Sequence, residues 1–287
     1  MLDRLLLVVG CLIAAGLFTI ISRYAWLWWT RVKPRKPNLE REWWSDCAEH
    51  GFAKVRENLV TIRNIRDFKW RTTKDHDISW TEKTFDINKI KDAWFIIDHF
   101  HRIKGLAHTM LSFEFEDGET VTFSFESRRE KGAKYSPWLG MWRAFELYLL
   151  VATEEDALYL RTNVRKHRVH MFRVEADKED NKALFLQLCK RLNQLGDRPE
   201  WYHTLSASCT TTIVSQVNAV STNKIPFNWR AFLPGHAARA AFRYKLIQDW
   251  GGYSKTLEIS EVAENARKWD GQTPFSQYIR EPLPKSP

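Results

Sequence analysis

The chain begins with a long apolar stretch. Residues 5–22 contain no charged side chain, and roughly 20 apolar residues are enough to span a bilayer as a helix. Arg23 and a cluster of Tyr and Trp residues at positions 24–29 follow, a pattern typical of a membrane interface. We therefore predict a single transmembrane anchor over residues 1–30. A cleaved signal peptide is the alternative, although no small-x-small cleavage site precedes the Trp cluster.

The polarity pattern changes after the anchor. Residues 31–58 start with a charged stretch containing two prolines and continue with a mixed helical pattern, so we expect a juxtamembrane linker and helix there. Residues 60–68 alternate between apolar and polar side chains, as a half-buried strand does. Residues 59–287 are predicted to form one folded domain.

The clearest strand pair lies in the middle of the chain. Residues 106–116 and 121–128 both alternate, and Asp117-Gly118 between them is a strong hairpin signal. Residues 180–195 have the apolar spacing of a helix and are followed by Gly196, a residue that commonly ends helices. Strands and helices together predict an α+β domain with an antiparallel sheet. The remaining assignments are a loop and short helix over 86–100, strand or helix over 145–151 and 157–161, and a short strand over 168–174.

The hairpin pattern also predicts which side chains share a face. The odd-numbered positions of 111–115 and 121–125 are apolar, and cross-strand partners share a face, so the even-numbered positions fall together on the other face. Pairing residue 113 with 121 places His108 opposite Glu126, and pairing it with 123 places Glu126 diagonal to His108. Either register lets the carboxylate approach the imidazole. Further polar residues on this face are Ser112, Ser124 and Arg128.

A cysteine occupies a position that favours its ionised form. Ser208 precedes Cys209 at the start of an apolar-periodic stretch, so Ser208 is a predicted N-cap and Cys209 lies in the first turn of a helix. The positive end of the helix dipole favours thiolate over thiol. Thr210 follows and is a supporting residue of the same turn.

Cys209, His108 and Glu126 are residue types that together perform nucleophilic catalysis. The imidazole accepts the thiol proton and later returns it, and the carboxylate fixes the imidazole tautomer. Spacing alone leaves other interpretations open, namely a solvated histidine, a cysteine that is only a small core residue and an exposed charged strip around Glu126. A zinc site built from His99, His101, His203 and Cys209 lacks the paired spacing of known zinc ligands. We expect neither a metal nor a cofactor.

Composition points to a membrane rather than to nucleic acid. The net charge of +9, with 14 Trp and 17 Phe, suits an anionic membrane surface, and no nucleic-acid-binding motif is present. The basic residues that follow the apolar stretch would place the domain in the cytoplasm by the positive-inside rule. Of the four cysteines, Cys47 and Cys189 are the pair left for a disulfide, and the sequence does not show whether they meet.

An ordered series of motifs resembles the Lnb-type periplasmic domain family, named for the lyso-form lipoprotein synthases. The similarity covers about residues 60–216 well and the C-terminal part loosely. The residues that carry it are 60–68, 107–113, 124–132, 135–137, 155–156, 160–163, 199–202, 208–211 and 274–276.

The resemblance implies a permuted papain-like fold, related to NlpC-type hydrolases, in which the histidine strand precedes the nucleophile helix. It implies Cys209 as nucleophile and His108 as base, and a periplasmic domain on a single-pass protein of the bacterial inner membrane. The family pattern has Asn before the cysteine, where this chain has Ser208, and an Asn there could contribute to an oxyanion site.

These observations predict a membrane-anchored cysteine acyltransferase or hydrolase that acts on a membrane lipid or lipoprotein substrate through a thioester. A cell-wall peptide amidase of the NlpC type and a non-catalytic, membrane-tethered binding domain are the alternatives. The sequence does not identify protein partners.

Overall fold

The computed structural model describes residues 2–102, 105–222, 224–226 and 234–285. The chain forms two compact units, one up to Asn38 and one from Leu39 onward. The first unit contains helix α1 (Leu2–Leu27) and a π-helical turn (Trp28–Val32). A helix over Leu6–Val32 is long and apolar enough to cross a membrane, with a mean hydropathy of 2.2. A signal sequence near the N-terminus would have the same properties.

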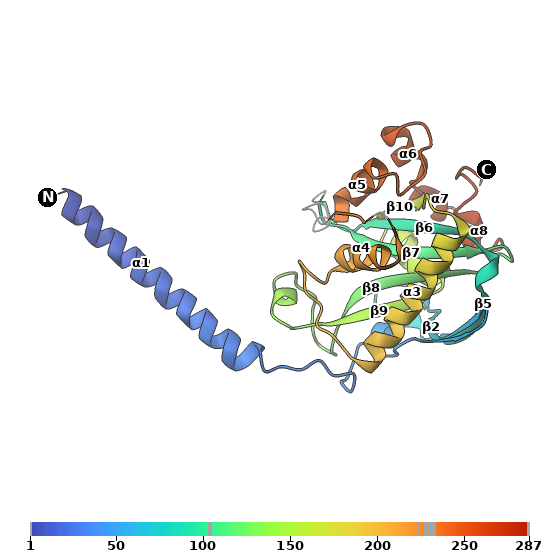
Figure 1. Cartoon of the computed structure of the whole chain (residues 1–287). Coiled ribbons are helices and arrows are strands. Elements are labelled where there is room, and N and C mark those ends of the chain that lie inside the picture. The colour runs from blue at the N-terminus through green and yellow to red at the C-terminus, as the bar shows by residue number, and fades with distance from the viewer. Residues whose placement is uncertain (1, 103–104, 223, 227–233, 286–287) are drawn as a thin grey trace. The chain divides into compact units, whose positions relative to one another are not determined.

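The second unit is built on an eight-stranded sheet (Figure 1). Seven strands follow the order β1-β2-β9-β8-β7-β6-β10, and β5 pairs with β2. The strands are β1 (Phe52–Arg56), β2 (Leu59–Arg66), β5 (Trp80–Asp86), β6 (Ile90–His99), β7 (His108–Phe115), β8 (Thr120–Arg128), β9 (Glu146–Ala152) and β10 (Arg168–Arg173); β3 (Lys69–Trp70) and β4 (His76–Asp77) form a separate pair.

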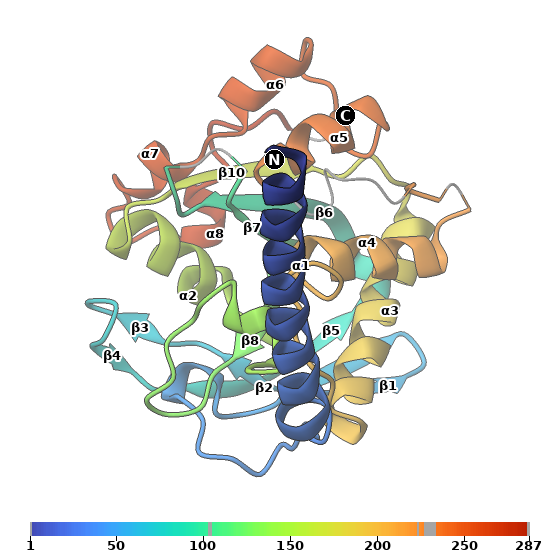
Figure 2. The same cartoon turned by 90° about the vertical axis from the view of Figure 1, so that its left-hand side faces the viewer.

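Helices cover both faces of this sheet (Figure 2). Figure 2 shows α3 and α4 on one side of it, and α2, α7 and α8 on the other. The α-helices of the second unit are α2 (Glu154–Tyr159), α3 (Lys178–Asp197), α4 (Cys209–Val220), α5 (Ala237–Arg243), α6 (Tyr253–Ile259), α7 (Ala263–Ala266) and α8 (Phe275–Tyr278). Short 3-10 turns lie at Ser45–Cys47, Ile87–Lys89, Leu139–Met141 and Pro234–His236, and a π-helical turn at Leu160–Val164.

The predicted hairpin is confirmed, with Phe113 opposite Val121. The odd-numbered apolar side chains of β7 and β8 pack into the main core, against Phe185 and Leu188 of α3 and Ile213 of α4. The even-numbered face is buried as well, since Met110 belongs to a second core formed with Phe275 of α8. Two layers of helices therefore exclude water from both faces of the sheet centre.

The α+β class is confirmed, but the expected antiparallel sheet is mixed. Strands β2 and β9 pair in parallel through Arg66 and Ala152. The loop and short helix expected over 86–100 are wrong for most of that range, because Ile90–His99 is strand β6. This strand is buried on both faces, so its apolar run lacks the alternation that marks a half-buried strand. Within the range expected as linker and helix, Phe52–Arg56 is strand β1.

Candidate active site

Cys209 is the first residue of α4, and its side chain is buried. Ser208 precedes it as the N-cap, and the backbone N–H of Ser208 donates to Thr211 Oγ1 at 2.9 Å. Thr210 Oγ1 lies 3.0 Å from Thr109 Oγ1 of β7 and 3.9 Å from the thiol. The start of the helix is therefore held against the start of β7, which brings the thiol to the histidine strand.

His108 is the first residue of β7, and its Nε2 makes two contacts to β8. One is to Ser124 Oγ at 2.7 Å and the other to Glu126 Oε1 at 3.1 Å. The Ser124 hydroxyl donates to Glu126 Oε1 at 2.8 Å, so its oxygen is left to accept from the imidazole. Nε2 therefore carries a proton, and in neutral His108 the lone pair is on Nδ1.

Charge interactions shift the pKa values of both Cys209 and His108, which line the same pocket. Burial alone would raise the pKa of the Cys209 thiol, but His108 and hydrogen bonds from Thr109 outweigh it and lower the pKa to about 7. Burial alone would lower the pKa of His108, but Glu126 and Cys209 raise it to about 10. Between these two values the pair exists as thiolate and imidazolium.

Glu126 is held in its ionised form by cations on two sides. Burial opposes its charge, but His108 and Arg161 keep the pKa of this carboxyl well below its usual range. The guanidinium of Arg161 donates to Glu126 Oε1 at 2.9 Å and lies 3.2 Å from Asp98 Oδ2. Arg161 lies in the π-helical turn after α2, and such turns often occur at functional sites.

The three groups line one pocket of about 250 Å³. Its wall is polar and aromatic, with Tyr135 and Tyr202 beside the thiol–imidazole pair. Of the histidines that the structure describes, His108 alone lines this pocket. No cluster of His, Cys, Asp or Glu suited to a metal ion occurs within the described residues.

Two of the expected supporting residues lie elsewhere. Ser112 is buried in a separate cluster, where it hydrogen-bonds Glu154. Arg128 donates to the carbonyls of Cys47 and Ala48 and so fixes the segment before β1. Both predictions used the alternation of even- and odd-numbered residues along a strand. This alternation shows which face of the sheet a side chain is on, but not how far along the strand it lies from the site. Ser124, Ser208 and Thr210 do lie at the site.

Spacing arguments missed three groups at the site. Arg161 donates to Glu126, Thr109 helps lower the pKa of the Cys209 thiol, and Tyr202 lines the pocket. Arg161 and Tyr202 lie inside motifs that carry the family resemblance. Those motifs could have marked both residues as candidates, although their spacing alone assigns them no role. Cys47 and Cys189 are both buried and unpaired.

This arrangement defines an α+β domain with a thiol, an imidazole and a carboxylate in one pocket, and in the chain the domain follows an N-terminal apolar helix. Residues 76–235 match the family described as the Lnb N-terminal periplasmic domain. The match spans more than half of the chain, so the chain belongs to that family, as its motifs predicted. It is thus a membrane-associated, Lnb-like protein. No curated protein and no solved structure matches it significantly.

Proposed function

We propose that this protein is a membrane-anchored cysteine acyltransferase or hydrolase, with Cys209 as nucleophile, His108 as base and Glu126 as the residue that positions the imidazole. The observation that carries the proposal is the meeting of these three side chains in one pocket with the thiol pKa lowered to about 7. Perturbed pKa values of this kind cluster at functional sites, because a nucleophile must be ionised at working pH.

The first half-reaction forms a thioester. The Cys209 thiolate attacks the carbonyl carbon of an acyl ester and the C–O bond breaks. The leaving alkoxide takes the proton from the His108 imidazolium and departs as an alcohol. Backbone N–H groups in the first turn of α4 have no acceptor within the helix, so they are suited to stabilise the oxyanion that forms on the way.

The second half-reaction releases the acyl group. An amine or a water molecule attacks the thioester carbonyl, and neutral His108 accepts its proton. The C–S bond breaks, the product is an amide or a carboxylic acid, and the thiolate–imidazolium pair is restored. Glu126 holds the His108 imidazole in the same tautomer and orientation in both steps, because its carboxylate accepts hydrogen bonds from Ser124 Oγ and from His108 Nε2.

The chain order supports a relationship to permuted papain-like enzymes, since the histidine strand β7 precedes the nucleophile helix α4. The apolar N-terminal helix, left uncleaved, would keep the domain at the membrane and raise its effective concentration towards lipid substrates. Membership of a periplasmic domain family favours the periplasmic side over the cytoplasmic side that the basic flank suggests.

The test is detection of the acyl-enzyme. The purified full-length protein is incubated in vesicles with a diacyl lipopeptide, and the peptide that contains Cys209 is analysed by mass spectrometry. We expect one acyl chain on Cys209 that hydroxylamine removes. The Cys189→Ala variant, altered at a buried cysteine outside the pocket, should acylate normally. An adduct that forms equally in Cys209→Ala, or cleavage of cell-wall peptides instead of the ester, would refute the proposal.

A further inference from the structure

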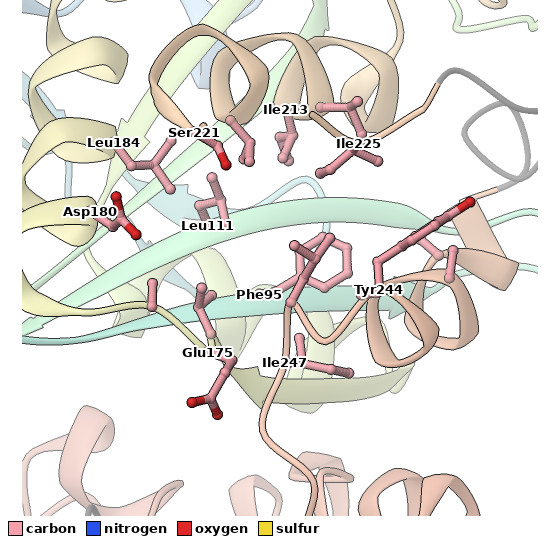
Figure 3. A pocket seen from close by; sticks show the side chains of 18 of the residues that line it. Phe95, Leu111, Glu175, Asp180, Leu184, Ile213, Ser221, Ile225, Tyr244 and Ile247 are labelled. Carbon is pink, nitrogen blue, oxygen red and sulfur yellow. The ribbon is translucent and has the colours of Figure 1, made fainter. Parts of the chain in front are cut away.

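A second cavity, lined mostly by aliphatic and aromatic side chains, lies beside the nucleophile helix (Figure 3). It is enclosed by α4, α3, strands β6 and β7, and α5 with the segment that follows it. Its walls include Phe95, Leu111, Leu184, Ile213 and Ile247, and its volume is about 170 Å³. An apolar cavity of about 150 Å³ is already large enough to bind benzene.

The cavity is adjacent to the reactive thiol. Thr210, the residue after Cys209, lines it. The hydroxyl of Thr210 is 3.0 Å from that of Thr109 and 3.9 Å from the Cys209 thiol. Two threonine side chains therefore connect the thiol to an apolar space that the proposed chemistry at Cys209 does not itself use.

The cavity is elongated along α4. Its lining residues on this helix run from Thr210 through Ile213 and Val217 to Val220, on the i, i+3, i+4 spacing of one helix face. With a rise of 1.5 Å per residue, these positions span roughly 15 Å. Such a length suits an extended alkyl chain better than a compact apolar ligand.

The few polar side chains of the lining argue against a charged ligand. They include two carboxylates, Glu175 and Asp180, and no Lys, Arg or His among the residues described. Both of these carboxylates are exposed to solvent, and the described lining offers no cation to pair with the carboxylate of a free fatty acid. An acyl chain held in a neutral ester or thioester has no ionised carboxylate and needs no such cation.

We infer that this cavity binds the hydrocarbon chain of the acyl group that Cys209 transfers. This inference rests on the proposed function, because it takes the thioester as the point from which the chain extends. The chain passes between Thr109 and Thr210, whose hydroxyl contact separates as it enters. Burial of the chain makes the site selective for long-chain acyl donors, since each methylene that leaves water favours binding.

The experiment compares a series of neutral p-nitrophenyl esters from acetate to laurate, each below its micelle concentration. We expect kcat/KM to rise with chain length, by up to about fourfold for each methylene that enters the cavity. The blocking variant is Val217→Phe, which places a ring in the cavity, and the matched control is Ala219→Phe, at an exposed position of the same helix. Val217→Phe should lose the chain-length preference while its acetate activity stays within about twofold of the parent, and Ala219→Phe should keep both.

A second blocking variant, Ala240→Phe in α5, guards against a folding defect, and both variants are checked by thermal unfolding. A binding readout uses Cys209→Ala with the neutral fluorophore N-phenyl-1-naphthylamine, which should bind, and should bind at least tenfold more weakly when Val217→Phe is added. Acetate hydrolysis without a chain-length preference, or a preference that survives both blocking variants, overturns the inference and leaves the proposed function standing. If no ester of any length acylates Cys209, the proposed function fails and the inference with it.

Discussion

Replacing His108 with glutamine should remove the cation that keeps Cys209 ionised. Burial alone would raise the pKa of this thiol, so without the imidazole the value should return at least to the ordinary 9.0 from about 7. A change of two pKa units corresponds to about 3 kcal/mol of lost stabilisation of the thiolate. At pH 7 the ionised fraction should fall from about one half to about 1 % or less.

The thiolate is the form that iodoacetamide alkylates, so its rate at pH 7 reports this fraction directly. The expected result for His108→Gln is at least a roughly 50-fold slower alkylation of Cys209 at pH 7, with a rate that recovers towards pH 9 and above. Peptide-resolved mass spectrometry separates the Cys209 peptide from that of Cys11 in the N-terminal apolar helix. An unchanged rate and an unchanged pH midpoint in His108→Gln would show that the imidazole does not ionise the thiol.

Three further outcomes are expected, two at the candidate site and one at a buried ion pair elsewhere in the domain. Esterase activity should rise with pH through about 7 as Cys209 ionises, and fall above about 10 as His108 loses the proton that the leaving group needs. A profile of kcat/KM against pH with no acidic limb near 7 would contradict this. Glu126→Gln should lower kcat by roughly 10- to 100-fold, because the imidazole loses its orienting carboxylate; unchanged kcat would exclude that role. Asp156→Ala should destabilise the domain by about 3–5 kcal/mol in urea unfolding, because it leaves the buried Arg66 guanidinium without its carboxylate partner. The two hydrogen bonds that would be lost are 2.7 and 2.8 Å long. A loss below about 1 kcal/mol would show that water or another group compensates.

Local sequence patterns predicted the helices and strands in which apolar and polar side chains lie on opposite faces. The β7–β8 hairpin follows from alternation and the Asp117-Gly118 turn, and α3 follows from its helical apolar spacing. Strand β6 was missed because helices cover both of its faces, so its sequence is apolar without a period. The parallel pairing of β2 with β9 joins segments about 85 residues apart in the chain, and no local pattern specifies it.

The same distinction holds for the candidate site. The sequence determined that Cys209 begins a helix behind a capping serine and that His108, Ser124 and Glu126 share a strand face, because both are consequences of local backbone geometry. Only the tertiary structure decided that α4 packs with its first turn against the start of β7, that Arg161 closes the charge network around Glu126, and that an apolar cavity adjoins the thiol. These are contacts between distant segments, and they depend on how the helices pack on the sheet and not on the spacing of residues along the chain.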